Sequence, residues 1–461
     1  MKTLKFIGVL VGILAFTACA STSSRITSEP PVQEKVLDNG LRVIVKPDHR
    51  APIVVSQVWY KVGSSYEPNG LTGISHVLEH MMFKGTKQLG PNEFSRIIAA
   101  NGGRENAFTG RDYTAYFQSL EKSRLEVSFK WEADRMQNLL LAEEEFKKEI
   151  EVVKEERRLR TEDKPEGLTY EKFMATAYSK SNYRNPIIGW PKDLGNMKLS
   201  DLQKWYEQYY APNNATIVVA GDVEPNEVFA LAEKYFGPIP PRKKLAPSQD
   251  PAEPIQTETR RVTVRAPAKV PYLLMGYHVP VIKAGSLQQW EPYALEILAY
   301  ILDGGKSARL NAQLVRGQQV AADAGVSYDP TSRHNSLFLF DANPAQDRTV
   351  PEVEKALREL IAQLQTELVE DKELQRIKTQ LLASRVYERD SVFYQAMKLG
   401  ELVTIGLPWQ LDSDLVTRLQ AVTPQQVRAV ARKYLVDSNL TVAVMEPKPV
   451  DMPAAVKDRG H

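Results

Sequence analysis

The chain has 461 residues, of which 43% are hydrophobic and 25% charged, so it can form at least two domains with a large core. Its 59 Lys and Arg residues nearly balance 57 Asp and Glu residues, giving a net charge of +2. This balance argues against a nucleic-acid-binding protein that works through a basic surface. The single cysteine excludes a disulfide framework and a cysteine-rich zinc finger.

The N-terminus has the pattern of an export signal. Two lysines precede an apolar run over residues 6–16, which is too short to span a membrane, and small residues follow. The Thr-Ala-Cys sequence that ends at Cys19 resembles a bacterial lipobox, with cleavage before Cys19 and a lipid on its sulfur. The Ala-x-Ala pattern around Cys19 also fits an ordinary signal peptidase. We favour the lipobox, because the chain has no other cysteine.

These patterns predict a signal peptide over residues 1–19 and a flexible tether over residues 20–34. We therefore expect an exported protein of the bacterial periplasm, attached to the outer membrane if Cys19 carries a lipid.

The first half of the remaining chain mixes strands and helices. The turn signal Asp38-Asn39-Gly40 lies between two β-rich runs and predicts a strand meander. Residues 73–86, GISHVLEHMMFKGT, predict a helix. Residues 101–118 indicate a strand, a turn and a second strand, and residues 124–162 a long helical region. A helix over residues 199–210 and a buried strand over residues 215–220 follow.

Residues 237–257 are rich in proline and polar residues, so they cannot continue a helix or a central strand. We expect a linker over residues 241–257. The segments before this linker and near the C-terminus share a helix, a turn with Asn and a strand. A common helix–turn–strand unit met by coincidence is the alternative. The matched pairs are Asn214 with Asn439, Thr216 with Thr441, and Val219 with Val444.

The repeat predicts an α+β fold with two tandem homologous domains, each an antiparallel-rich β-sheet covered by helices on one face. The domains are expected over residues 35–240 and 258–448, with a tail over residues 449–461.

His76, Glu79 and His80 lie in the predicted helix of residues 73–86. Residues four apart lie on the same face of a helix with Cβ atoms about 5–6 Å apart, so both imidazoles can reach one metal ion. Glu79 is placed to accept a proton from water activated by that metal. The alternative is a core helix with two hydrogen-bonded histidines. We favour the metal site, because the chain has only six histidines.

A catalytic zinc usually has a third protein ligand. Glu149 and Glu156 lie seven residues, or about two helical turns, apart on a predicted apolar face, where an ionised carboxylate is costly unless paired or metal-bound. One would be the ligand, and the other would orient a histidine or the water. Composition alone does not choose between them, and ion pairs to Arg104 or Arg111 are an alternative. The predicted apolar face consists of Ala142, Phe146, Val152, Val153 and Leu159.

The motif His-x-x-Glu-His, with a glutamate 76 residues beyond its second histidine, resembles the inverted-motif zinc peptidases of the pitrilysin or M16 family. The resemblance runs from about Lys35 to Pro447 and is strongest to two-domain subunits of the mitochondrial-processing-peptidase type. It implies that His76, His80 and Glu156 bind one Zn²⁺ per chain. It also implies that Glu79 and Glu149 are the catalytic glutamates.

The resemblance also implies a substrate site. Asn106, Ala107 and Thr109 match the edge strand to which an extended peptide adds a strand, and Phe83 matches a residue that lines a side-chain pocket. The second half has no zinc motif, since apolar or small residues take the place of its members. These are Leu295, Leu298 and Ala299 for the helix of residues 73–86, and Ile377 and Ser384 for the two glutamates.

The family forms dimers that enclose a chamber, in which an Arg and a Tyr of the second half hold the peptide. Arg316 matches the Arg, but Asp323 stands at the Tyr position. We therefore expect a dimer, either with itself or with an M16-like subunit that supplies the Arg and Tyr pair.

The sequence predicts a zinc-dependent endopeptidase, the catalytic subunit, that cleaves small or unfolded polypeptides. The alternative is a non-catalytic peptide-binding or assembly subunit. No nucleic-acid partner is expected.

Overall fold

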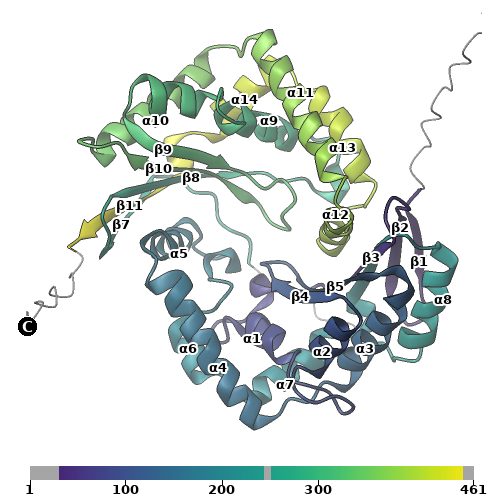
Figure 1. Ribbon diagram of the computed structural model, residues 1–461. Helices are drawn as coiled ribbons and strands as arrows, with labels where there is room; N and C mark the ends of the chain where they lie inside the picture. The colour runs from purple at the N-terminus through teal and green to yellow at the C-terminus, as the bar shows by residue number, and fades with distance from the viewer. Residues whose placement is uncertain (1–30, 243–250, 450–461) are drawn as a thin grey trace, which may run out of the picture.

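The computed structural model describes residues 31–242 and 251–449. These residues form two halves, each built on one β-sheet (Figure 1). Residues 1–30 and 450–461 lie outside the described residues, and so do the predicted signal peptide, Cys19, residues 20–30 of the predicted tether and all of the predicted tail but its first residue. Among the described residues, no helix is both long enough and apolar enough to cross a membrane.

The first sheet has six strands in the order β1-β2-β6-β3-β5-β4. The predicted meander is wrong at one point, because β6 lies between β2 and β3, parallel to β2 and antiparallel to β3. All seven residues of β6 are buried, and a strand that is apolar on both faces belongs in the middle of a sheet. The strands are β1 (Gln33–Val36), β2 (Arg42–Pro47), β3 (Ile53–Tyr60), β4 (Arg104–Thr109), β5 (Thr114–Glu121) and β6 (Ala215–Gly221).

The second sheet repeats this arrangement, with strand order β7-β11-β8-β10-β9. The predicted tandem fold is confirmed, down to its turns. Asn214 donates to the carbonyl oxygen of Tyr209 at 2.9 Å, and Asn439 donates to that of Tyr434 at 3.1 Å, each at the end of the preceding helix. The strands are β7 (Arg260–Pro267), β8 (Tyr272–Val279), β9 (Ala321–Ser327), β10 (Ser336–Pro344) and β11 (Leu440–Lys448).

The helices of the first half are α1 (Ile74–Met81), α2 (Glu93–Ala100), α3 (Leu125–Asn138), α4 (Glu143–Arg157), α5 (Pro165–Ala177), α6 (Pro191–Asn196), α7 (Leu199–Tyr209) and α8 (Pro225–Phe236). Those of the second half are α9 (Glu291–Asp303), α10 (Val350–Thr366), α11 (Asp371–Glu388), α12 (Val392–Thr404), α13 (Leu411–Gln420) and α14 (Pro424–Tyr434).

The long helical region predicted over residues 124–162 is interrupted between α3 and α4. Tertiary hydrogen bonds replace helical ones there: Lys87 N–H donates to Asn138 O at 3.0 Å, and Leu140 N–H donates to Gly85 O at 3.1 Å. A bridge between Thr86 and Leu139 joins the same segments. No proline or glycine marks this break, so local sequence did not reveal it.

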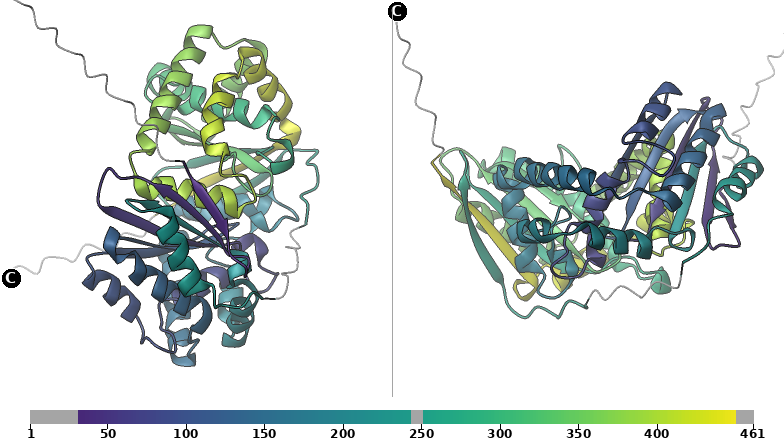
Figure 2. Two further views of the ribbon diagram at one scale, coloured as in Figure 1. Left: turned by 90° about the vertical axis from the view of Figure 1, so that its right-hand side faces the viewer. Right: turned by 90° about the horizontal axis from the view of Figure 1, so that it is seen from below.

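Each half places one helix against the sheet of the other half (Figures 1 and 2). Helix α5 of the first half packs on β7, β8 and β11, and helix α12 of the second half packs on β2, β3 and β6. The prediction that helices cover one face of each sheet is therefore incomplete. The second face of each sheet is covered too, by a helix from the other half.

A glycine permits the closest approach in both of these contacts. A Cβ atom built on Gly400 of α12 would lie 2.1 Å from the Trp59 ring of β3. A Cβ atom on Gly276 of β8 would lie 2.5 Å from the Phe173 ring of α5. Because Trp59 and Phe173 are both fully buried, neither ring can move away without disturbing the contact between the halves.

We expect Gly400→Ala to lower the free energy of unfolding by about 1–3 kcal/mol, the usual cost of overpacking a buried contact. The matched control is Gly195→Ala in α6, because a Cβ atom there would meet nothing within 4 Å. The midpoint of urea denaturation measures both variants. Equal midpoints for Gly400→Ala and the wild type would show that the interface adapts.

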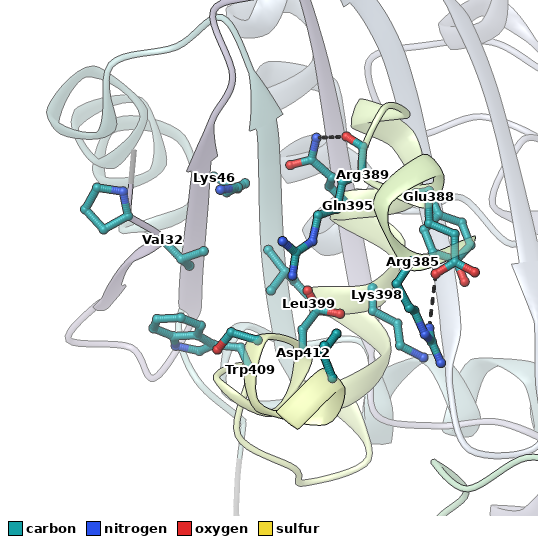
Figure 3. A pocket seen from close by; sticks show the side chains of 14 residues that line it. Val32, Lys46, Arg385, Glu388, Arg389, Gln395, Lys398, Leu399, Trp409 and Asp412 are labelled. Atoms are coloured by element: carbon teal, nitrogen blue, oxygen red, sulfur yellow. Dashed lines mark hydrogen bonds and ion pairs between the residues drawn. The ribbon is translucent and has the colours of Figure 1, made fainter. Parts of the chain in front are cut away.

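Figure 3 shows a cavity at the edge of the interface between the halves. Leu399 of α12 and Asp412 of α13 face Val32 and Lys46 across it, and Trp409 lies beside Val32. The indole nitrogen of Trp409 donates to Glu34 at 2.9 Å, which joins the segment between α12 and α13 to β1. This cavity contains no residue of the predicted metal motif.

Candidate metal and catalytic site

Helix α1 carries the His-x-x-Glu-His motif, and its apolar residues fix the orientation of the motif. Ile74, Val77, Leu78 and Met81 are fully buried in the core of the first half. Their spacing places them on one side of the helix, so the two histidines and Glu79 lie toward the opposite side, where they line a cavity.

The N-terminus of α1 is held by a buried carboxylate. Glu67 accepts hydrogen bonds from the backbone N–H groups of Gly73 at 2.7 Å and Ser75 at 2.9 Å. Burial raises the pKa of Glu67 to about 8. Gly73 has φ of 86°, and its Cβ would lie 2.6 Å from the carbonyl oxygen of Ile188, so this turn requires glycine. The motif helix therefore begins at a fixed point.

Helix α4 brings Glu149 and Glu156 to the motif. The predicted apolar face is only partly right: Phe146 and Val153 are buried, but Val152 is 48% exposed and Leu159 is 50% exposed. Ile150 takes the place of Val152 in the core. The face is rotated because α4 packs on α1 rather than on the sheet.

Three of these residues converge on one point. One ligand atom from each of His76, His80 and Glu156 lies within 4.8 Å of the other two. His80 Nε2 is 3.4 Å from Glu156 Oε2, and His76 Nε2 is 3.8 Å from Glu156 Oε1. Within residues 31–242 and 251–449, no other group of three such side chains converges in this way.

These distances fit a zinc ion. Both exceed an ordinary hydrogen bond of about 2.9 Å. Ligand atoms that each lie about 2.0–2.1 Å from a tetrahedral zinc are about 3.3–3.5 Å apart. The distance of 3.4 Å from His80 falls in this range, and the distance of 3.8 Å from His76 is slightly longer. Two imidazoles and one carboxylate are also the donor set of many catalytic zinc sites, which keep the fourth position open.

Glu149 contacts a histidine of the group. Its Oε2 lies 3.1 Å from His80 Nδ1, and its Oε1 lies 2.6 Å from Lys84 Nζ. Burial raises the pKa of Glu149, but the hydrogen bonds from His80 and Lys84 outweigh it and lower that pKa. An ionised Glu149 fixes the His80 ring so that Nε2 faces Glu156. Ion pairs to Arg104 or Arg111 do not form; the basic partners are Lys84 for Glu149 and Arg160 for Glu156.

The pKa values of the two histidines are shifted in opposite directions. Burial and the neighbouring His80 lower the pKa of His76 to about 4, so His76 is neutral near pH 7. Burial also lowers the pKa of His80, but Glu149 and Glu156 outweigh it and raise that pKa to about 9. The neutral ring of His76 leaves a nitrogen lone pair free for a cation.

Glu79 lies beside the edge strand β4. It accepts a hydrogen bond from the hydroxyl of Thr109 at 2.5 Å, and burial raises its pKa. β4 is the last strand of the first sheet, so its outer edge is not paired with another strand. Asn106 is exposed on this edge, and Ala107 is partly buried.

A cavity of about 730 Å³ contains the motif and this strand. Its lining residues include His76, Glu79, His80, Glu156, Asn106, Ala107 and Thr109. Two predicted substrate residues are absent from the lining. Phe83 packs against the Tyr116 ring and the Arg135 guanidinium instead. Arg316 is exposed in the second half, where it donates to the carbonyl oxygen of Lys306.

Among the described residues of the second half, no equivalent group of three side chains is found. Leu295 and Leu298 of α9 and Ile377 of α11 are buried in an apolar core. Sequence reasoning missed three side chains of the site, namely Glu67, Lys84 and Arg160. Lys84 and Arg160 each lie four residues after a metal-motif residue, a helical spacing that could have indicated them.

Comparisons with known proteins agree with this geometry. The family model "Insulinase (Peptidase family M16)" matches residues 42–190, and "Peptidase M16 inactive domain" matches residues 196–381. Zinc protease PqqE of Helicobacter pylori is 34% identical over 442 residues, with 95% of this chain and 98% of that protein covered. An uncharacterized zinc protease of Bacillus subtilis, YmxG, is 26% identical, with 90% and 98% covered.

Solved structures show the same fold. The crystal structure of a protease from Helicobacter pylori has a TM-score of 0.86 and 31% identity, and covers 91% of this chain and 100% of that chain. The periplasmic protease PqqL of Escherichia coli has a TM-score of 0.76 and 19% identity, and covers 91% of this chain and 48% of that chain. With a relative more than 30% identical over nearly the whole length and both family models matched, the chain belongs to peptidase family M16.

Proposed function

We propose that the chain is a zinc-dependent endopeptidase that cleaves small or unfolded polypeptides, with one Zn²⁺ per chain held by His76, His80 and Glu156. The observation that carries this proposal is the convergence of these three side chains within 4.8 Å, beside a buried glutamate and an open sheet edge. Homologues named zinc proteases support it.

The proposed chemistry assigns one role to each residue around the site. A bound zinc ion supplies Lewis-acid activation of the attacking water and of the scissile carbonyl. Glu79 accepts a proton from that water and passes it to the leaving amine nitrogen. Thr109 holds the carboxylate of Glu79 through its hydroxyl group. Glu149 holds the His80 ring in the orientation that ligation needs.

The substrate is proposed to lie along β4 in an extended conformation. The unpaired edge of β4 offers backbone N–H and C=O groups to a peptide strand, and Asn106, Ala107 and Thr109 line the cavity beside it. This mode binds through the backbone, so it suits unfolded segments of many sequences rather than one folded protein.

A non-catalytic subunit is the alternative function. The model described as an inactive domain matches only residues 196–381, which contain none of the four motif residues. His76, Glu79, His80 and Glu156 all lie in the part matched by the other model. A subunit kept only for assembly has no need of all four, and this favours catalysis.

We also propose a dimer in the periplasm, with the lipid of Cys19 as membrane anchor. This chain covers 48% of PqqL, a periplasmic protease, and 92% of its solved first half, so PqqL has the length of two such chains. Two copies of this chain, or one copy with an M16-like subunit, would give an assembly of the same size. Arg316 would then face the partner's cavity rather than its own.

Metal removal tests the proposal. We expect the purified full chain to contain about one zinc ion and to hydrolyse unfolded casein. Chelation should reduce hydrolysis to a few per cent, and one equivalent of Zn²⁺ should restore it, because no side chain replaces the metal's charge. Elemental analysis and hydrolysis are measured on the same samples. Full hydrolysis by a metal-free sample would refute the zinc mechanism, and zinc without hydrolysis would favour the non-catalytic alternative.

A further inference from the structure

Arg111 lies at a junction between two cavities. It lines the cavity that contains the metal motif and a second cavity between the two halves of the molecule. Its backbone is fixed, because Ser65 N–H donates to the carbonyl oxygen of Arg111 at 2.8 Å. The side chain therefore stands at a defined point beside the end of β4.

The guanidinium group of Arg111 has only neutral neighbours among the described residues. Its Nη2 donates to the hydroxyl of Tyr170 at 3.1 Å. Its central carbon, Cζ, lies 5.7 Å from the centre of the Tyr183 ring. Its Nε is buried and has no hydrogen-bond partner. Within residues 31–242 and 251–449, no carboxylate forms an ion pair with it. A cation placed in this way lacks an anionic partner.

Two carboxylates that line these cavities with Arg111 already have other partners. Asp112 accepts hydrogen bonds from Ser65 and Arg333. Glu171 is held by both terminal nitrogens of Arg157, at 2.7 and 3.0 Å. Arg111 therefore remains a cation without a carboxylate partner at the junction of the two cavities.

The position of Arg111 relative to the chemistry follows from the strand. Thr109 donates to Glu79, which marks the place of the scissile bond, and Arg111 follows two residues later. An extended peptide beside β4 advances about 3.3 Å per residue, as β4 itself does. Arg111 lies in the turn that joins β4 to β5, so a substrate group that meets it lies just past the end of β4, within a few residues of the scissile bond.

We infer that Arg111 forms a carboxylate-binding subsite of the substrate channel. It binds an acidic side chain, or the C-terminal carboxylate of a short peptide, just past the end of β4 and within a few residues of the bond that is cleaved. This inference rests on the proposed function, because it takes the peptide to lie along β4.

Peptide binding to zinc-loaded full-length Glu79→Gln tests the subsite without turnover. The probes are fluorescent peptides of one sequence that carry Glu, Gln or Lys at each of three positions on either side of the scissile bond. A second set ends in a free carboxylate or in an amide. At one position, the Glu peptide should bind about tenfold more tightly than the Gln peptide, since a hydrogen-bonded charge is worth about that much. A preference confined to free-acid peptides would assign the subsite to the C-terminus.

Substitutions of Arg111 in the same background decide the assignment. Arg111→Gln should remove the preference for Glu while leaving the affinity of the Gln peptide within about twofold. Arg111→Lys should retain part of the preference, which distinguishes lost charge from misfolding. Arg104→Gln, at the exposed start of β4, should retain all of it. Equal binding of Glu and Gln peptides, or a preference that survives in Arg111→Gln, would overturn the inference.

The two proposals fail in different ways. Wild-type hydrolysis of the same peptides without any acidic preference would overturn the subsite alone. An acidic preference in binding, with no hydrolysis by the zinc-loaded wild type, would overturn the peptidase alone.

Discussion

Glu79→Gln is expected to lower kcat by about 10³-fold while leaving the zinc content at one ion per chain, because proton transfer by a positioned carboxylate contributes about 10²–10⁴-fold. Glutamine has nearly the same shape and can still accept the hydrogen bond from Thr109. Glu79 lies outside the group formed by His76, His80 and Glu156, so its charge is not needed to hold the metal. Elemental analysis and peptide hydrolysis, measured on one preparation, separate these two effects.

The matched control is Glu144→Gln, an exposed glutamate in the first turn of α4. It should hydrolyse peptide at the wild-type rate. Wild-type turnover by Glu79→Gln would show that another group transfers the proton. Loss of zinc from Glu79→Gln would instead show that this carboxylate helps to hold the metal.

The second large effect is expected at a buried ion pair within α3. Glu132 and Arg135 of α3 have side-chain exposures of 0% and 1%, and Arg135 Nε donates to Glu132 Oε2 at 2.7 Å. The guanidinium also lies 4.4 Å from the centre of the Tyr116 ring. We expect Glu132→Gln to lower the free energy of unfolding by about 3 kcal/mol or more, because it leaves a buried cation without its counter-charge.

Two controls bracket this prediction. Glu126→Gln, also on α3, breaks an exposed pair with Lys234 of α8 and should leave the stability almost unchanged, because solvent screens such a pair. Arg135→Met added to Glu132→Gln should recover part of the lost stability, because it removes the unpaired charge. Urea denaturation measures all three variants. A change below about 0.5 kcal/mol for Glu132→Gln would mean that the aromatic rings alone stabilise Arg135.

The sequence predicted the parts of the fold that follow from local pattern. The helical spacing of His76 and His80, the strand–turn–strand over residues 101–118, and the matched Asn214 and Asn439 all correspond to observed geometry. Each depends on residues close together in the chain. The choice of Glu156 over Glu149 came from the family resemblance rather than from the residues themselves.

The sequence did not predict features that depend on distant segments. β6 enters the first sheet from residues 215–221, so nothing near β2 and β3 indicates that they are separated. The break after Asn138 is imposed by backbone partners at residues 85 and 87. Val152 is apolar but exposed, since α4 turns Ile150 to the core instead. Arg111 looked like an ion-pair partner for Glu149 or Glu156, yet it lies at the end of β4 among tyrosines.

The reciprocal placement of α5 and α12 constrains how a polypeptide can enter. A hinge motion that parted the halves would uncover Trp59 and Phe173 together, along with the apolar side chains that pack around each ring. Each opening would expose two apolar surfaces to water, and exposure of even one of them costs free energy. Two separate contacts therefore hold the halves together, one at α5 and one at α12. We expect a substrate to enter beside β4 without separation of the halves.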